Sequence, residues 1–276
     1  MKAAQATDTV NMALFCDFEN IALGAREAAY PQFDIGKVLE RLLLKGSIVV
    51  KKAYCDWARY RDFKAPMHEA SFELIEIPHV SQSGKNSADI RMVVDALDLC
   101  YTKQHVDTFV IISGDSDFSP LVSKLRENDR TVIGVGVKKS TSDLLIANCD
   151  EFIFYDDLVR AARPAAKPPG KAPARKRAAK KPEKPAPPPV DNKKEEAWNL
   201  VVETYKALLK ERGEGENIWG SMVKQTLKRR SPGFSESYHG FGSFGQLLEE
   251  AGARGILDLE RDEKSGGFII KGCRAS

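Results

Sequence analysis

The sequence predicts an α/β domain with a mostly parallel sheet flanked by helices, followed by a flexible basic linker and a small winged-helix domain. Strand-like and helix-like segments alternate over the first part of the chain, a pattern typical of parallel sheets. A stretch rich in proline, alanine and lysine follows, and three helical patterns with a terminal hairpin come after it. We therefore expect domains over 1–160 and 194–276, joined by a linker over 161–193.

Short apolar or β-branched runs predict the strands of the first domain, at Met12–Cys16, Ser47–Tyr54, Phe72–Pro78, Thr108–Ser113, Thr131–Val137 and Phe152–Tyr155. Apolar residues at helical spacing predict the helices between them, at Asp34–Leu44, Tyr60–Phe72, Ala88–Tyr101, Phe118–Asn128 and Ser142–Asn148. Ligands of such sheets bind outside the carboxyl ends of the strands. The residues that follow each strand are therefore the first candidates for a functional site.

The linker carries most of the excess positive charge. Residues 160–194 contain 12 basic and 2 acidic side chains, whereas residues 1–159 contain 18 and 24, and residues 195–276 contain 12 and 13. Few linker residues are large enough to bury, and its prolines oppose helix formation, so we expect an extended, mobile tether. Two interpretations fit this composition: a polybasic arm that contacts a nucleic acid backbone, and a solubilising linker without a partner.

The last segment contains three helical patterns, over Glu196–Arg212, Ile218–Arg230 and Ser243–Ala251. Gly213 is the expected C-cap of the first helix, and Ser243 is the expected N-cap of the third. Ile256–Arg261 and Gly267–Lys271 flank a polar turn and predict a two-stranded wing. Three helices and a hairpin are typical of a winged-helix domain.

The composition is that of a water-soluble protein. The sequence has no apolar run of about 18 residues that could span a membrane, and Met1–Asn11 is too polar for a signal peptide. The five cysteines are scattered without a CxxC pair, which argues against zinc and thioredoxin-like chemistry. Cys16, Cys100 and Cys149 lie in or beside apolar runs. We expect them to be small buried side chains in a cytoplasmic protein with no membrane contact.

Acidic and amide side chains follow the strongest strands. Asp17 and Asn20 come after the first strand, Asp115 and Asp117 come after the run Phe109–Ser113, and Asp89 begins a helix between them. Carboxylates gathered at the edge of a sheet repel one another and need a proton or a cation. A divalent metal and chemistry on phosphate esters are the usual answer.

These motifs resemble the NYN family, a branch of the PIN-like nucleases, and within it the bacterial LabA-like proteins. Three blocks carry the resemblance, with matching order and spacing: Leu14-Phe15-Cys16-Asp17-Phe18-Glu19-Asn20, Lys85-Asn86-Ser87-Ala88-Asp89-Ile90 and Ser113-Gly114-Asp115-Ser116-Asp117-Phe118. The last block is the most specific. The resemblance implies a ribonuclease that uses Mg²⁺ or Mn²⁺ to activate water against an RNA phosphodiester.

The resemblance also implies a role for each matched position. The carboxylates of the metal site would be Asp17, Asp89, Asp115 and Asp117. Asn20 would hold the first aspartate or contact the phosphate. Lys85 and Ser113 are further candidates for phosphate contact, and the alternative for Ser113 is that it simply forms the turn. Hard oxygen ligands suit Mg²⁺ or Mn²⁺. One departure concerns the loop before Asp89, because the glycine of the family's Lys-Gly-x-Asp pattern is absent here.

The last segment resembles the OST-HTH (LOTUS) domain, through Phe234, the run Tyr238-His239-Gly240-Phe241 and the run Phe244-Gly245-Gln246-Leu247-Leu248. The resemblance implies RNA binding, and such domains also bind protein partners. The candidate RNA contacts are basic or aromatic: Lys224, Lys228, Arg229, Phe234, Tyr238 and Phe241. The structural alternative is that the aromatic residues form core and the basic residues form a solvated face.

Other interpretations of the acidic residues remain. Asp17, Asp89, Asp115 and Asp117 can each act as a turn or helix-cap residue. A haloacid-dehalogenase-like phosphatase is disfavoured, because its nucleophile motif needs Asp-x-Asp, whereas Glu19 stands two places after Asp17. The main alternative to a ribonuclease is an RNA-binding regulator with the same fold and little or no catalysis.

Deletion of residues 163–192 distinguishes the two interpretations of the linker. If the basic residues bind RNA phosphates, the deletion weakens RNA binding and makes its dependence on salt concentration shallower. The log–log slope should change by about 0.7 for each phosphate of a single strand that is no longer neutralised. Fluorescence anisotropy with labelled RNA over a salt series measures both quantities. An unchanged slope identifies a passive linker.

Overall fold

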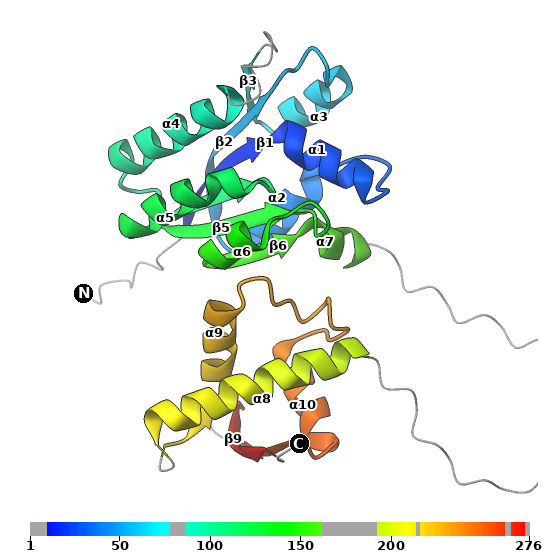
Figure 1. The fold of residues 1–276 in the computed structure, drawn as a ribbon, viewed down its shortest axis with the longest axis vertical. Coiled ribbons are helices and arrows are strands. Elements are labelled where there is room, and N and C mark those ends of the chain that lie inside the picture. Colours follow the sequence, from blue (N-terminus) through cyan, green and yellow to red (C-terminus); the bar gives the residue numbers. More distant parts are fainter. Residues whose placement is uncertain (1–9, 78–86, 162–191, 214–215, 263–265, 274–276) are drawn as a thin grey trace, which may run out of the picture. The chain divides into compact units, whose positions relative to one another are not determined.

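A computed structural model of the chain describes residues 10–77, 87–161, 192–213, 216–262 and 266–273. These residues form two compact units, the first built around a six-stranded sheet and the second around a three-stranded sheet (Figure 1). Nearly all of the predicted linker over 161–193 lies outside the described residues, and so does Lys85.

The six-stranded sheet is entirely parallel, with the strand order β3-β2-β1-β4-β5-β6. Its strands coincide with the predicted segments to within a few residues: β1 (Asn11–Asp17), β2 (Ser47–Cys55), β3 (Glu73–Glu76), β4 (Thr108–Ile112), β5 (Thr131–Gly136) and β6 (Glu151–Phe154). The order reverses direction between β1 and β4, which are neighbours in the sheet but distant in the sequence. Such a reversal opens a crevice at the carboxyl ends of the two strands.

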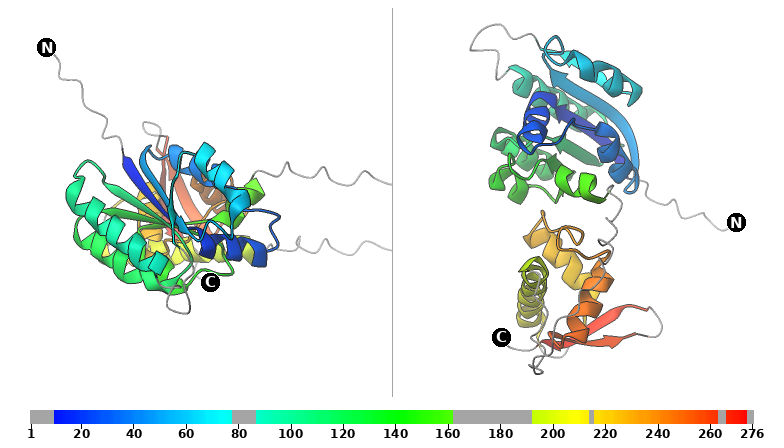
Figure 2. Two further views of the ribbon diagram at one scale, coloured as in Figure 1. Left: turned by 90° about the horizontal axis from the view of Figure 1, so that it is seen from above. Right: turned by 90° about the vertical axis from the view of Figure 1, so that its right-hand side faces the viewer.

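Helices cover both faces of this sheet (Figure 2). One face is covered by α1 (Phe18–Glu27), α2 (Ile35–Leu43), α3 (Lys64–Glu69) and α7 (Tyr155–Ala161). The other is covered by α4 (Ser87–Thr102), α5 (Ser119–Glu127) and α6 (Asp143–Asn148). The α/β architecture predicted from the alternation of elements is thereby confirmed.

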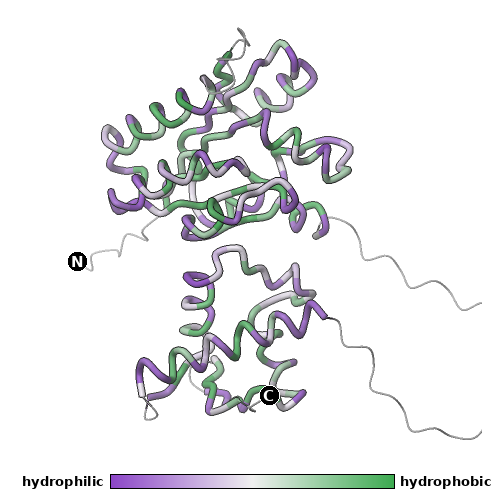
Figure 3. The backbone as a smooth tube through the Cα atoms, in the orientation of Figure 1, coloured by the Kyte–Doolittle hydropathy of each residue, from purple (hydrophilic) through white to green (hydrophobic). Residues whose placement is uncertain are grey.

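The side chains of β1 alternate between the two cores. Leu14 and Cys16 pack against the first group of helices, whereas Ala13 and Phe15 pack against the second. Each of these side chains is fully buried, because the strand lies in the middle of the sheet with helices above and below it. The apolar colouring of the central strands in Figure 3 follows from this double cover.

Two helices of the first unit are absent from the sequence-based prediction. Helix α1 follows β1 without any intervening loop, since the Asp17 side chain caps it by accepting a hydrogen bond from the Asn20 N–H. Its buried residues Phe18, Ile21 and Ala25 have helical spacing. Helix α7 likewise follows β6 directly. The predicted helix over Tyr60–Phe72 is reduced to a 3-10 turn, Arg61–Phe63, and the short α3.

The second unit contains the three helices and the hairpin that the sequence predicts. Its helices are α8 (Asn192–Arg212), α9 (Gly220–Arg230) and α10 (Phe244–Ala253), and its strands are β7 (Ile218–Trp219), β8 (Leu257–Arg261) and β9 (Phe268–Cys273). The sheet is antiparallel in the order β7-β9-β8. Gly213 has the positive φ of a C-cap, and Ser243 caps α10. Both caps agree with the sequence-based expectation.

One predicted boundary in the second unit is wrong. Ile218 and Trp219, assigned from the sequence to the second helix, form strand β7 and pair with Ile270 and Ile269 of β9. The pairing partner lies about fifty residues further along the chain, and the local spacing of apolar residues does not reveal this pairing. The predicted two-stranded wing is accordingly a three-stranded sheet.

The cysteines and the helices agree with two further expectations. Cys16, Cys100 and Cys149 are buried free thiols, as the sequence predicts. In the part of the chain that the structure describes, no helix combines the length and the apolar character needed to cross a membrane.

Gly134 in β5 offers a test of how tightly the sheet is covered. A β-carbon at this position would lie 2.3 Å from the ring of Phe152 and 2.9 Å from the Cys149 sulfur, both in the core. We expect Gly134→Ala to lower the free energy of unfolding by about 1–3 kcal/mol through overpacking. Urea denaturation measures this loss.

Gly245→Ala is the matched control for that substitution. Gly245 lies inside α10, and a β-carbon placed there would have no neighbouring atom closer than 3.7 Å. Alanine at this position should leave stability unchanged or raise it by up to about 1 kcal/mol. Equal losses for the two variants would contradict the packing described here.

Candidate active site

The candidate site lies where β1 and β4 end side by side. Asp17 is the last residue of β1, and the residues Ser113, Gly114 and Asp115 follow β4. Cys16 pairs with Ile112 in the sheet, so the two strands end at the same level. Residues that are about a hundred positions apart in the sequence therefore meet at the crevice between the strands.

Hydrogen bonds join these two chain segments directly. The Ser113 hydroxyl donates to Asp17 Oδ2 at 2.9 Å, and the backbone N–H of Gly114 donates to Asn20 Oδ1 at 2.8 Å. The Asn20 N–H donates in turn to Asp17 Oδ1 at 3.3 Å. Both oxygens of the Asp17 carboxylate are thus held, and Asn20 connects the start of α1 to the loop after β4.

Gly114 is needed for this close approach. A β-carbon at this position would lie 2.5 Å from the carbonyl oxygen of Ser140 and 3.0 Å from Cα of Thr141. Both are backbone atoms, so the clash could be relieved only by moving the main chain. The Gly114 carbonyl also accepts from the Ser142 N–H at 2.9 Å. Close packing therefore requires a glycine at this position of the Ser-Gly-Asp block.

The loop after Gly114 orients the next carboxylate. The Asp115 N–H donates to the Ser113 hydroxyl at 3.2 Å, and Asp115 Oδ1 accepts from the Asp117 N–H at 3.0 Å. Asp115 is therefore the N-cap of the 3-10 helix Ser116–Phe118, one of the capping roles that the sequence left open for these aspartates. Asp115 combines a capping role with a place in the site.

Three carboxylates from separate segments line one open cavity of about 220 Å³. Asp17 comes from β1, Asp89 from the first turn of α4, and Asp115 from the loop after β4. Asn20 lines the same cavity. The remaining lining residues are Glu19, Leu23, Tyr54, Cys55, Asp56, Ile77 and Ala88. The tertiary structure thus brings together four of the five catalytic residues predicted from the sequence.

Asp17 titrates far from its usual range. Burial raises its pKa from 3.8 to about 7, and the nearby negative charges of Asp89 and Asp115 add to the increase. Hydrogen bonds from Ser113 and from the Asn20 N–H act in the opposite direction. A buried carboxylate facing like charges is unstable as an anion unless a cation is present.

These residues fit a hard divalent cation in their chemistry. Carboxylate and amide oxygens are the ligands of Mg²⁺ and Mn²⁺, and Mg²⁺ is usually held by one or two carboxylates together with water and substrate phosphate. Within the described residues, no three acidic, histidine or cysteine side chains stand close enough to form a complete metal cluster. One or two of Asp17, Asp89 and Asp115 would be the direct protein ligands, with the other positions left to water and substrate.

Cysteine chemistry is excluded at this cavity. Cys55 lines it, but burial raises the pKa of its thiol, and the negative charges of Glu19 and Asp17 raise it further. The thiol stays protonated at neutral pH and is a poor nucleophile.

The structure places other predicted residues apart from the cavity. Asp117 is exposed and is not among the lining residues, so its metal role remains a prediction. Lys85 lies outside the described residues. Asp95, which lies on α4 with Asp89, accepts a hydrogen bond from the Tyr54 hydroxyl at 2.9 Å and is largely buried.

Sequence reasoning missed the contributions of Glu19, Tyr54 and Asp56. Asp56 follows the end of β2 directly, which is the same signal that identified Asp17. Tyr54 pairs with Asp17 in the sheet register. Burial opposes ionisation of Asp95, but the Tyr54 hydroxyl, Lys52 and Arg91 outweigh it and lower its pKa. This group of residues attaches α4, which carries Asp89, to the sheet.

The candidate RNA contacts of the C-terminal segment are unequally exposed. Phe241 is buried against Trp198, and Phe234 is also buried, so neither ring has an open face for stacking. Tyr238 is half-buried, with the Lys193 ammonium 4.9 Å from its ring centre. Of the basic candidates, Arg229 is exposed, Lys228 is half-buried, and Lys224 forms an ion pair with Glu236 at 2.9 Å.

The fold and this cavity define a parallel α/β domain with an acidic site at the point where its strand order reverses. The NYN domain model matches residues 11–156, which span the whole six-stranded sheet. The chain therefore belongs to the NYN domain family, whose fold is that of the PIN-like nucleases. The second unit lies outside the matched residues.

Two similar proteins extend the comparison. The uncharacterised protein MJ0482 of Methanocaldococcus jannaschii is 29% identical over 113 residues, which cover 41% of this chain and 43% of that protein. The chain thus matches less than half the length of that relative. The crystal structure of VPA0982 from Vibrio parahaemolyticus, a protein of unknown function, is 27% identical with a TM-score of 0.50. It covers 56% of this chain and 98% of its own.

The raised pKa of Asp17 predicts an unusual dependence of stability on pH. Between the unfolded value near 3.8 and the folded value near 7, the folded protein holds a proton that the unfolded chain releases. In a chelator, the wild-type protein therefore loses stability as pH rises through this window, and Asp17→Asn does not. The melting temperature of Asp17→Asn minus that of wild type should rise from pH 4 to pH 7 and then level off.

Asp98→Asn is the control, because Asp98 is an exposed carboxylate on α4, the helix that carries Asp89. Its melting temperature should follow that of wild type across the series. Parallel curves for wild type and Asp17→Asn would show that Asp17 titrates normally.

Proposed function

We propose that the chain is a metal-dependent ribonuclease that hydrolyses RNA phosphodiester bonds in the acidic cavity of its NYN domain. One observation carries the proposal: Asp17, Asp89 and Asp115 come from three separate segments and line one cavity at the carboxyl ends of β1 and β4. Membership of the NYN family supports a nucleic acid as the substrate. Bound Mg²⁺ or Mn²⁺ would supply charge neutralisation and a more acidic water.

The chain's own residues orient the carboxylates for this role. Ser113 donates to one oxygen of Asp17, and the Asn20 N–H donates to the other, so the carboxylate cannot rotate freely. The Asn20 amide keeps the loop after β4 against α1 through Gly114. Hydrogen-bonding partners of this kind orient metal ligands and commonly alter activity by about 10–100-fold when removed.

The second unit and the linker would bind RNA and raise its concentration at the cavity. The linker region, residues 160–194, has 12 basic and only 2 acidic side chains. Arg229, Lys228 and Tyr238 are the second unit's remaining surface candidates, since Phe241 and Phe234 are buried. The OST-HTH-like sequence of this unit also suggests a protein partner.

A second candidate function is an RNA-binding regulator with weak or no catalysis. It is favoured by the absence, among the described residues, of three metal-ligand side chains in close contact. The missing glycine before Asp89 points the same way, because this departure from the family pattern stands next to a carboxylate of the site. The two functions differ in whether RNA is cut when a divalent ion is supplied.

Cleavage assays with graded substitutions test the proposal. Wild type should cut single-stranded RNA with Mn²⁺ or Mg²⁺ and be inactive in a chelator. Asp17→Asn and Asp115→Asn remove ligands and should reduce the rate by more than about 100-fold, whereas Ser113→Ala removes an orienting hydrogen bond and should reduce it by about 10–100-fold. Denaturing gels with labelled RNA measure the rates.

The exposed Asp98→Asn variant is again the control and should retain full activity. Circular dichroism of each variant establishes that the loss does not come from unfolding. If wild type binds RNA but cuts none of a panel of sequences with either metal, the regulator is the correct function.

A further inference from the structure

A second cavity, of about 140 Å³, lies beside α1 on the first unit. The residues that matter for its chemistry are Leu23, Arg26, Tyr30, Phe33, Tyr60 and Phe63. Four of these six side chains are aromatic, and one is a cation. The cavity is open at the surface, with Arg26 exposed and Tyr60 and Phe63 half-buried at its edge.

This aromatic pocket adjoins the acidic cavity. Leu23 of α1 lines both of them. The same helix is capped by Asp17 and carries Asn20, so one rigid element connects the carboxylates to the aromatic rings. Asp17 and Leu23 are separated by about 9 Å along the helix axis at 1.5 Å per residue. A polymer chain with a phosphate in the acidic cavity therefore passes close to the aromatic pocket.

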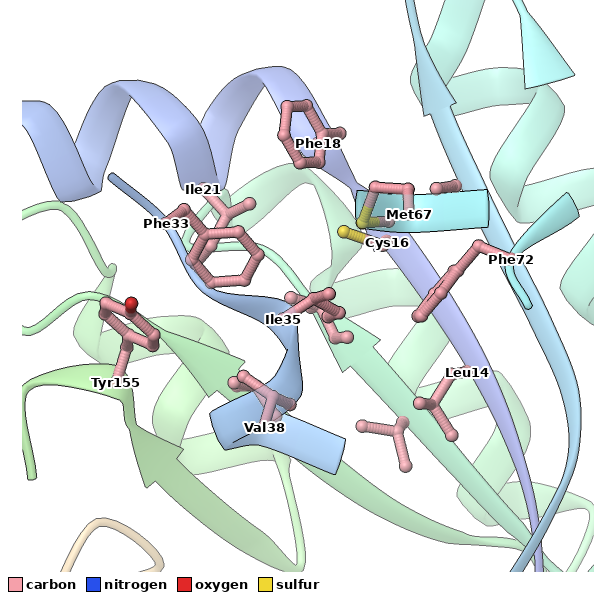
Figure 4. Packing of buried hydrophobic residues seen from close by; sticks show 14 of the residues in the cluster. Leu14, Cys16, Phe18, Ile21, Phe33, Ile35, Val38, Met67, Phe72 and Tyr155 are labelled. Atoms are coloured by element: carbon pink, nitrogen blue, oxygen red, sulfur yellow. The ribbon is translucent and has the colours of Figure 1, made fainter. Parts of the chain in front are cut away.

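The aromatic rings divide into an inner and an outer set. Phe18, the first residue of α1, is completely buried, and Figure 4 shows it in one cluster with Ile21 and Phe33. The rings of Tyr60 and Phe63 contact Phe18 edge-on, with centres 5.7 and 5.0 Å away. These edge contacts fix the orientation of the outer rings. Their half-buried position leaves surface available to a ligand.

The volume of the pocket fits a single flat ring. Sites for complete small molecules commonly occupy about 300–1,000 Å³, which is more than this pocket provides. An apolar cavity of about 150 Å³ holds one benzene ring. A pocket of about 140 Å³ lined by aromatic side chains therefore suits one unstacked aromatic ring.

Positive charge stands at the rim of the pocket. Arg26 lies in the last turn of α1 and is exposed. Arg59 pairs with Glu19 at 3.2 Å, and about half of its side chain remains exposed. Glu19 belongs to the lining of the acidic cavity, and Arg59 directly precedes Tyr60 of the aromatic pocket in the sequence. A ligand with an aromatic ring and a neighbouring negative charge would satisfy both features.

We propose that the aromatic pocket holds one unstacked base of single-stranded RNA, from the nucleotide next to the phosphate in the acidic cavity. This inference rests on the proposed function. Stacking on aromatic side chains accepts any base, because every base presents a π-face. A base that must leave its stack to enter the pocket makes duplex RNA a poor substrate. The proposed pocket therefore favours single-stranded RNA over duplex RNA, with little sequence preference.

Abasic substitution combined with protein variants tests the pocket. A short single-stranded RNA is prepared with one abasic nucleotide at each position in turn, and its binding to the full chain is measured by anisotropy with Ca²⁺, a hard cation that can join the carboxylates to a phosphate, in place of Mg²⁺ or Mn²⁺. With wild type, one position should show a loss of about 5- to 100-fold, the range expected for one stacked base. Tyr60→Leu or Phe63→Leu should produce the same loss with intact RNA and should abolish the abasic effect.

Tyr101→Leu is the matched control, because Tyr101 is an exposed aromatic residue on α4 that lines neither cavity. Photocrosslinking of 5-iodouracil-containing RNA to the unaltered protein, followed by mass spectrometry, adds a measurement that needs no variant. Crosslinks at Tyr60, Phe63 or Tyr30 support the proposal. Crosslinks confined to other residues, or an abasic effect that persists in Tyr60→Leu and Phe63→Leu, overturn it.

The results separate this inference from the proposed function. If RNA is cleaved but an abasic nucleotide weakens binding equally at every position, the ribonuclease function stands and the base pocket is rejected. Crosslinks at Tyr60 or Phe63 without cleavage support the pocket and reject hydrolysis. RNA that fails to bind wild type at all rejects both.

Discussion

The adjacency of β1 and β4 in a parallel sheet is the constraint on which the rest of the first unit depends. It places the ends of two strands at the same level, although their residues are about a hundred positions apart. The hydrogen bonds from Ser113 to Asp17 and from Gly114 to Asn20 then hold the two chain segments together. The acidic cavity is a consequence of this arrangement, because Asp17 and Asp115 leave the sheet on either side of the crevice.

The same arrangement has an energetic cost. Asp17 is buried beside two other carboxylates, and its pKa is raised to about 7. The protein holds it there with two hydrogen bonds that favour the charged form but only partly offset burial. In the proposed function, a cation bound in the cavity would neutralise this charge, and the free energy recovered would contribute to binding. Stability and cation affinity would then be opposed at this position.

Helix α1 serves three purposes at once. Its inner face, with Phe18, Ile21 and Ala25, completes one core of the sheet. Its N-terminus is capped by Asp17 and brings Asn20 to the acidic cavity. Leu23, further along the helix, lines both that cavity and the aromatic pocket. Because core packing fixes the helix, the two cavities keep a constant separation, which a substrate extending from one to the other requires.

The sequence by itself determined the strands, most helices and the residue types of the site, because burial on both faces leaves apolar runs and polar residues gather where strands end. It did not reveal α1, which follows β1 without a loop, or β7, whose partner is distant in the sequence. Only the tertiary structure decided that Asp89 joins Asp17 and Asp115 while Asp117 remains exposed, and that Phe241 is core. The physical reason is that proximity across a sheet depends on strand order and on the direction of each side chain, and neither is encoded in local spacing.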